Sequence, residues 1–120
     1  MGLVGGLSVD RKLVPPLDRD VFSTIDEKIH ARARLGIMTM LVTQGELDFT
    51  QLKQKLGLSD GNLSAHTRIL EEAGYIKIHK TFLGRRPKTV IVGTPKGHDA
   101  YWAYLNHLES ILKIAKNHSN

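Results

Sequence analysis

The sequence predicts an α+β fold, mostly helical, in which two helices joined by a short turn are followed by a β-hairpin and a terminal helix. Before residue 74 and again after Pro95, apolar residues recur at three- and four-residue spacing, as in amphipathic helices. Between these regions, Tyr75–Lys80 alternates apolar and polar residues, and Thr89–Val92 is β-branched throughout, which is typical of strands. Glycines at positions 45, 57 and 74 separate the segments, because glycine commonly ends a helix.

Composition limits the class of molecule. The 120 residues are enough for one domain with a modest core. The chain has no cysteine, which excludes disulfides, thiol catalysis and thiolate metal sites. Its net charge of +5 favours a polyanionic partner. No run approaches the about 18 apolar residues of a membrane span, and the N-terminal segment lacks a basic leader. We therefore expect no membrane association and a cytoplasmic location.

The N-terminal third combines a tail with helical patterns. Residues 1–16 are rich in glycine and end in a Pro-Pro pair, so we expect a loose tail there and a folded domain over residues 17–120. Two apolar stripes follow, over residues 17–30 and 31–43, and whether they form one helix or two is left open by the pattern. Their members are Val21, Phe22, Ile25 and Ile29, and then Leu35, Met38, Leu41 and Val42.

Residues 46–73 have the pattern of a strand and two short helices. Glu46–Asp48 is short enough to be one edge strand, and the helix after it begins with Asp48 or Thr50 as a cap. Gly57 ends this helix, and Ser59 is suited to cap the next one, over residues 59–73. Two helices separated by a short glycine-containing turn form a helix-turn-helix. The inward residues of the second helix are expected to be Leu63, Thr67 and Leu70.

The second helix has the side chains of a DNA-reading element on its remaining faces. Asn62 can pair with adenine through two hydrogen bonds, and Arg68 with guanine. Ser64 is small enough to allow a close approach to phosphate or base. For His66, an ordinary solvent contact is as good an interpretation as a DNA contact. Arg68 has an alternative too, because Glu71 and Glu72 are placed to pair with it along the helix.

The predicted hairpin, residues 75–92, is strongly basic. Between Tyr75 and His98 there are six lysines or arginines and no acidic residue. We expect Phe82–Pro87 to form the hairpin loop, which brings together Lys80, Arg85, Arg86 and Lys88. These cations could neutralise backbone phosphates or enter a minor groove and sense its width. The alternative is a solvated basic surface without a partner.

The terminal helix is expected to begin at Thr94-Pro95, a capping residue followed by proline. A small core cannot easily bury both its apolar stripe and the stripe before residue 30. The surplus predicts a homodimer, since two-fold symmetry is the commonest assembly. The expected dimer-interface residues are Val21, Phe22, Ile25, Tyr101, Leu105, Leu108, Ile111 and Leu112.

Catalytic signals are lacking. The sequence has no metalloprotease, nucleophile-elbow or phosphate-loop motif, so we expect no enzyme activity and no cofactor. His98-Asp99 and His107 with Glu109 could be read as a weak metal site on the terminal helix. That site would need ligands from a second chain, and we expect no metal.

Three stretches together resemble the small winged-helix transcriptional regulators of bacteria and archaea, in the MarR/ArsR-like group. They are HARARLGIMTML, GELDFTQLKQKLGLSDGNLSAHTRILEEAGYIKI and FLGRRPKTVIVGTPKG, and the resemblance covers about residues 30–104. It implies a winged helix-turn-helix with extra terminal helices for dimerisation. The resemblance also implies sequence-specific binding of a homodimer to double-stranded DNA, at a palindromic operator and usually as a repressor.

The resemblance assigns roles to particular residues. It places Asn62, Ser64, Ala65 and Arg68 in the reading helix and Arg85, Arg86 and Lys88 in the wing. The full set of expected DNA-binding residues is Ser59, Asn62, Ser64, Ala65, His66, Arg68, Lys80, Arg85, Arg86 and Lys88. Two alternatives remain open. One is a protein-interaction module of a transcription complex that contacts DNA nonspecifically, and the other is a sensor of a metal or small-molecule effector.

Overall fold

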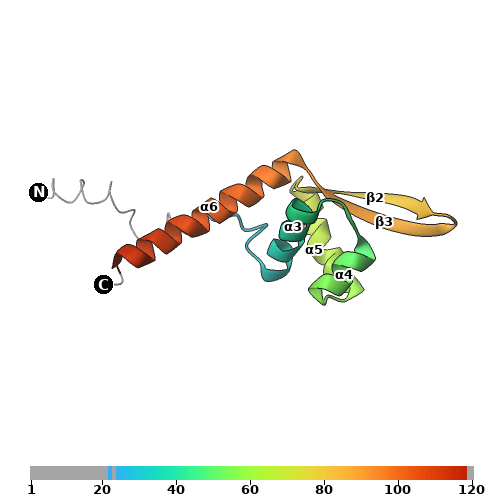
Figure 1. The fold of residues 1–120 in the computed structure, drawn as a ribbon, viewed down its shortest axis with the longest axis horizontal. Helices are drawn as coiled ribbons and strands as arrows, with labels where there is room; N and C mark the ends of the chain where they lie inside the picture. Colours follow the sequence, from blue (N-terminus) through green and yellow to red (C-terminus); the bar gives the residue numbers. More distant parts are fainter. Residues whose placement is uncertain (1–21, 23, 119–120) are drawn as a thin grey trace, which may run out of the picture. The chain divides into compact units, whose positions relative to one another are not determined.

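The structure, a computed structural model, describes residue 22 and residues 24–118 (Figure 1). The fold is the α+β, mostly helical winged helix-turn-helix that the sequence predicts. A three-stranded antiparallel sheet has the strand order β1-β3-β2, and no helix in the described part is long and apolar enough to cross a membrane. The elements are α3 (Arg32–Gln44), β1 (Leu47–Asp48), α4 (Phe49–Leu56), α5 (Asp60–Glu72), β2 (Ile76–Leu83), β3 (Arg86–Gly93) and α6 (Pro95–His118).

The described residues belong to two compact units. The larger one, residues 26–103, contains α3, β1, α4, α5, the β2–β3 hairpin and the first part of α6. The smaller one includes residues 104–118 of α6 together with Phe22, Thr24 and Ile25. Within it, the Thr24 hydroxyl oxygen and His107 Nε2 are 2.6 Å apart.

The helix predicted over residues 17–30 is wrong for its second half. Residues 24–31 form turns and bends rather than a helix, while the predicted tail and the residues up to Val21 lie outside the described part. A side chain ends the helical pattern here: Asp26 Oδ1 accepts hydrogen bonds from the backbone N–H groups of Lys28 at 2.8 Å and Ile29 at 3.3 Å. Aspartate competes with helix formation in this way. Ile29 is still fully buried, so its apolar character serves the core from a turn.

The core of the larger unit lies between the helices and the sheet. The second predicted helix is confirmed as α3, although its buried residues are Ile37, Met38 and Leu41, while Leu35 and Val42 are half-buried. The three residues that we expected to face inward from α5 are all buried. Thr67, a polar member of this core, donates its hydroxyl to the carbonyl of Leu63 at 2.9 Å. The other large core side chains include Ile29, Leu52, Leu63, Leu70, Ile76 and Ile91.

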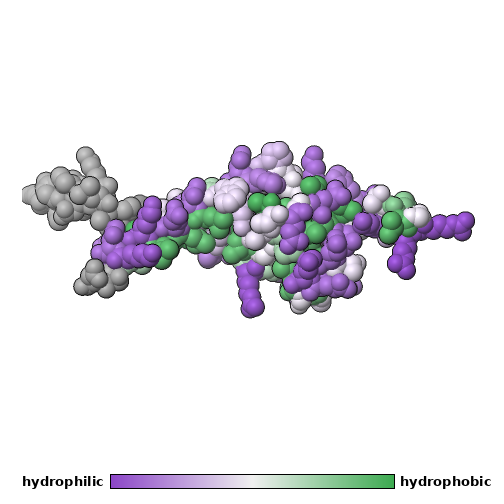
Figure 2. Space-filling model, viewed as in Figure 1, coloured by the Kyte–Doolittle hydropathy of each residue, from purple (hydrophilic) through white to green (hydrophobic). Residues whose placement is uncertain are grey.

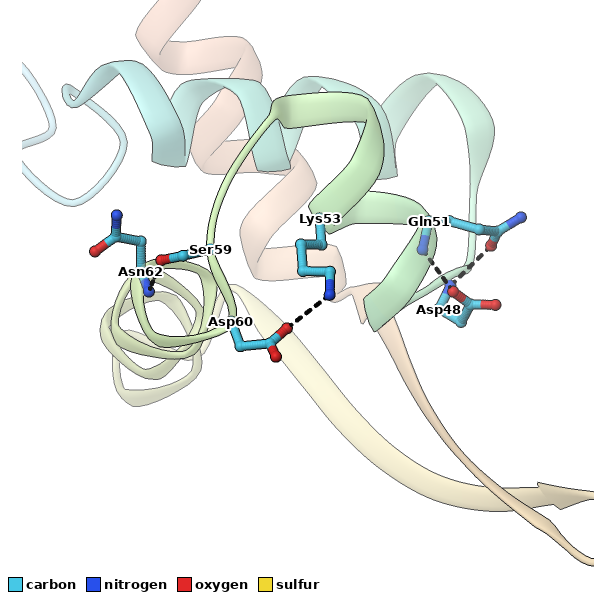
Figure 3. Close-up of polar contacts among 6 residues, drawn as sticks. All are labelled: Asp48, Gln51, Lys53, Ser59, Asp60 and Asn62. Atoms are coloured by element: carbon cyan, nitrogen blue, oxygen red, sulfur yellow. Dashed lines mark hydrogen bonds and ion pairs between the residues drawn. The ribbon is translucent and has the colours of Figure 1, made fainter.

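Local signals fix the helix-turn-helix (Figure 3). Asp48, rather than Thr50, caps α4: its carboxylate accepts from the Gln51 N–H at 2.7 Å, and the Gln51 side chain accepts from the Asp48 N–H at 3.0 Å. Gly57 ends α4 with a left-handed φ of 64°. The Ser59 hydroxyl then caps α5 by accepting from the Asn62 N–H at 3.1 Å, as predicted.

An ion pair also joins the two helices. Lys53 Nζ of α4 lies 3.0 Å from Asp60 Oδ1 of α5. Because the Asp60 side chain is largely exposed and that of Lys53 is about one third exposed, solvent screens the pair and it adds little to stability. Asp60 therefore contacts α4 and also lies in the first turn of α5, at the positive end of the helix dipole.

The hairpin is longer and its turn shorter than predicted. The pairing Leu83↔Arg86 leaves only Gly84 and Arg85 in the turn, and Gly84 has the left-handed φ of 66°. Phe82 and Pro87, which we placed in the loop, are paired strand residues. Ile76 is buried and Ile78 half-buried, whereas residues 79–87 are exposed throughout. The hairpin therefore extends away from the helices of its own unit (Figure 1).

A tight corner joins the end of α5, the start of β2 and the start of α6. The Thr94 hydroxyl accepts from the Gly97 N–H at 3.0 Å, which confirms the predicted start of α6, and it donates to the Gly74 carbonyl at 2.6 Å. The Thr94 N–H donates to the Tyr75 carbonyl at 3.0 Å. The Tyr75 hydroxyl donates to Asp26 at 2.5 Å. Burial, followed by this bond to a carboxylate, raises the pKa of Tyr75 to about 12.

Candidate nucleic-acid interface

The face of α5 that points away from the core carries most of the predicted DNA-reading residues. Because Leu63, Thr67 and Leu70 anchor the helix on one side, short side chains and one long cation occupy the other. Ser59 lies at the start of this face, where its hydroxyl is engaged as the helix cap. The exposed residues predicted from the sequence are Ser59, Asn62, Ser64, Ala65 and Arg68.

A hollow of about 350 Å³ separates α5 from the hairpin. Ser64, Arg68 and Glu71 line it from the helix, and Ile78 and Thr89 line it from the strands. The alternative role for Arg68 was an ion pair with Glu71 or Glu72, and no such pair occurs among the described residues. Arg68 is therefore an exposed residue that lines this hollow, which is the groove between α5 and the hairpin.

His66 lies on another side of α5 and contacts α3. Its Nδ1 is 3.2 Å from Arg34 Nη1. Since a guanidinium group can only donate, His66 Nδ1 accepts this hydrogen bond, and only Nε2 can then donate. The same arginine donates to the carbonyl of Lys28 at 2.7 Å. His66 is half-buried, and through this hydrogen bond it contributes to the packing of α5 against α3. The sequence alone could not distinguish this role from a solvent contact or a DNA contact.

The cationic residues of the hairpin lie on its two opposite faces and in its turn. Cross-strand partners share a face and alternate residues point to opposite faces, so Lys80, paired with Thr89, lies on the face that lines the groove beside α5. Arg86 and Lys88 lie on the opposite face, and both line a second hollow of about 390 Å³ beside the start of α4. Arg85 is in the turn itself.

Sequence reasoning missed one residue of this surface, Thr50, and one residue that holds α5 from another side, Arg34. Thr50 was considered only as a helix cap, but Asp48 takes that role, and Thr50 is exposed and lines the same hollow as Arg86. Arg34 had no signal in the sequence, because its contacts with Lys28 and His66 depend on the tertiary fold.

The residues expected at a dimer interface differ in their exposure. Tyr101 belongs to the core of the larger unit, because it is only 5% exposed and its hydroxyl lies 3.0 Å from the Thr39 hydroxyl. Leu112 is 52% exposed and Phe22 is 49% exposed. The remaining described members of the set, Ile25, Leu105, Leu108 and Ile111, are half-buried, and Val21 lies outside the described residues. No group of three metal-binding side chains occurs in the described part of the chain.

Comparison with known proteins agrees with this geometry. Residues 33–112 match the model of a family described as winged helix DNA-binding domain. The uncharacterized protein MJ0432 of Methanocaldococcus jannaschii is 38% identical over 84 residues, which cover 70% of this chain and 88% of that protein.

Solved structures share the fold. A transcriptional regulator homologue from Pyrococcus horikoshii OT3 superposes with a TM-score of 0.71 at 29% identity, covering 79% of this chain and 92% of that one. A protein of Enterococcus faecalis V583, described as a transcriptional regulator of the MarR family, has a TM-score of 0.65 at 19% identity, covering 99% and 96%. The predicted winged helix DNA-binding domain is thereby confirmed, and structures described as MarR- and ArsR-family regulators share its fold.

Proposed function

The chain belongs to the winged helix DNA-binding domain family and is a DNA-binding transcription regulator, and on that premise we propose that it acts as a homodimeric repressor at a palindromic operator. It binds double-stranded DNA sequence-specifically in the cytoplasm, with α5 in the major groove and the β2–β3 hairpin as the wing. No catalytic step is involved. The single observation that supports this proposal best is the exposed reading face of α5, which borders a groove shared with a basic hairpin in the same unit.

Within this interface the residues have different tasks. Asn62 and Arg68 read base edges, because an amide matches adenine and a guanidinium matches guanine in the major groove. Ser64 and Ala65 leave room for the helix to approach, and Ser59 lies where α5 begins. The wing cations neutralise phosphates, and each contact releases counterions. Lys80 does so from the α5 side, and Arg85, Arg86 and Lys88 from the turn and the opposite face.

The proposed dimer is formed by the terminal helices. Leu105, Leu108, Ile111 and Leu112 of α6 are half-buried or exposed, and covering them against a second copy removes apolar area from water. Phe22 and Ile25 supply further apolar surface in the same unit. Two-fold symmetry then places two α5 helices in successive major grooves, about 34 Å apart.

Selection of genomic fragments by the purified chain tests the function. At about 0.15 M salt, where long-range electrostatic attraction is partly screened, we expect recovery of inverted repeats whose half-sites are one helical turn apart. Sedimentation should give twice the 13.4 kDa of one chain. Fragments without a common motif would instead favour the alternative, a protein-interaction module that binds DNA nonspecifically.

Two substitutions separate base reading from phosphate binding. Arg68→Ala should cost about 1–3 kcal/mol of binding free energy on the best site and relax the preference for one base pair. Arg86→Ala should weaken all duplexes similarly and make binding less dependent on salt. Titrations of operator and scrambled duplexes by fluorescence anisotropy at several salt concentrations measure both effects. Unchanged operator binding by Arg68→Ala would mean that another face of α5 reads the DNA.

A further inference from the structure

Two large apolar side chains are exposed at the free end of the wing. Phe82 is 69% exposed and Leu83 is 67% exposed, and they are the last paired residues of β2 before the turn. Figure 2 shows hydrophobic surface near the end of the hairpin, bordered by hydrophilic side chains. Single apolar residues on a surface are common, but two adjacent ones at the tip of a projecting hairpin need a reason.

Folding of the chain does not supply that reason. Ile78 is the last residue of β2 that lines the groove beside α5, and Leu83 lies five positions further along the strand. At about 3.3 Å per residue, the tip is about 17 Å beyond this contact. A two-stranded hairpin without a packed face is marginally stable in water. Leu83 lines the second hollow beside the start of α4, whereas Phe82 lines neither hollow, so the Phe82 side chain is available for a partner.

The charge around the tip identifies the kind of partner. Lys80, Arg85, Arg86 and Lys88 all lie within the same hairpin, and no acidic residue occurs between Tyr75 and His98. A uniformly anionic partner fits this surface, and DNA presents one negative charge for about every 1.7 Å of its axis. An apolar side chain among cations is also the combination with which proteins enter the minor groove, where they partially unstack a base step.

We propose that Phe82 is an apolar wedge that enters the minor groove next to the α5 contact and opens a base step there, which deepens the DNA-binding function proposed above and rests on it. The minor groove is about 6 Å wide, which is wide enough for one apolar side chain to enter and partially unstack a base step.

The strand register distinguishes Phe82 from its neighbour. Phe82 pairs with Pro87 and shares its face with Ile78 and Thr89, the two strand residues that line the groove beside α5. Leu83 pairs with Arg86 and lies on the opposite face. Phe82 is thus on the same side as the reading helix and Leu83 is not, although their exposed fractions are nearly equal.

A wedge at this place adds sequence preference outside the reach of α5. Pyrimidine–purine steps such as TA and CA unstack and kink more easily than others. The operator should therefore favour such a step where the wing tip lies. Arginines that only neutralise phosphates would create no such preference.

The test compares Phe82→Ala with Leu83→Ala in the full chain, on the duplex selected above. Phe82→Ala should lower affinity about tenfold, the loss expected for removing one aromatic contact with a base, with an unchanged slope of log K against log salt. Arg85→Ala should reduce that slope by about 0.9. Energy transfer between dyes at the duplex ends should show a bend with the wild-type chain and with Leu83→Ala, and a smaller bend with Phe82→Ala.

The outcomes separate the inference from the function on which it rests. If the wild-type chain prefers no duplex, the proposed function fails. If it binds its operator and Phe82→Ala binds and bends that duplex as the wild type does, only the wedge is overturned. An affinity loss for Phe82→Ala accompanied by a change of mass in sedimentation also overturns it, because the tip would then contact a second copy of the chain. Circular dichroism of both variants should match that of the wild type, since neither side chain is in the core.

Discussion

Gly97→Ala is expected to destabilise the protein by about 3 kcal/mol, although alanine is the better helix former. Gly97 is buried in the first turns of α6. A Cβ atom placed on it would lie 2.1 Å from the carbonyl oxygen of Tyr75 and 2.9 Å from its carbonyl carbon. Backbone cannot rotate out of the way as a flexible side chain can. Either α6 or β2 must move, and the hydrogen bond from the Thr94 N–H to the Tyr75 carbonyl would be strained or lost.

Gly61→Ala is the matched control. Gly61 is an exposed position of α5 with nothing within 4 Å of an added Cβ, so the same substitution should stabilise the protein by about 0.5 kcal/mol through the unfolded chain. Urea unfolding of both variants measures the two changes. If both substitutions changed the free energy of unfolding equally, the close approach of Gly97 to the Tyr75 carbonyl would not be what requires glycine at position 97.

Leu63→Ala should lower the free energy of unfolding by about 3 kcal/mol. The Leu63 side chain is fully buried and comes from the reading helix, so its removal leaves a cavity beneath α5. Because small domains are stable by only about 5–15 kcal/mol, this one change removes a large fraction of the total. Thermal and urea denaturation both measure it.

Leu83→Ala deletes the same atoms from the tip of the wing and is expected to change stability by less than about 0.5 kcal/mol. Because both variants replace leucine by alanine, the difference between their losses in free energy of unfolding measures the effect of burial. A loss at Leu83 similar to the loss at Leu63 would mean that the hairpin tip packs against something in the folded protein.

Elements with local signals could be predicted from the sequence. Asp48, Gly57, Ser59 and Gly74 each act on backbone groups within a few residues, through a capping side chain or a left-handed φ. The helix-turn-helix and the start of α6 at Pro95 were correct for this reason. The inward face of α5 was correct as well, because helical spacing alone determines which residues share a face.

Features that depend on distant contacts could not be predicted. The turn over residues 24–31 has the apolar spacing of a helix, and Asp26 is fixed by a bond from Tyr75, which is 49 positions away. Tyr101 has the spacing of an interface residue, yet Thr39 of α3 occupies its hydroxyl. The length of the hairpin depends on strand register, and a glycine-proline segment reads equally well as a six-residue loop or as a two-residue turn.

The exposure of residues 79–87 has an evolutionary consequence. Mutations in this part of the wing can accumulate with little loss of folding stability, because most substitutions away from packed or bonded sites change it only slightly. Mutations in α5 are more constrained, because its reading residues alternate with buried residues whose replacement lowers folding stability. Divergence of DNA preference among copies of this gene should therefore begin at the wing tip, before the reading helix changes.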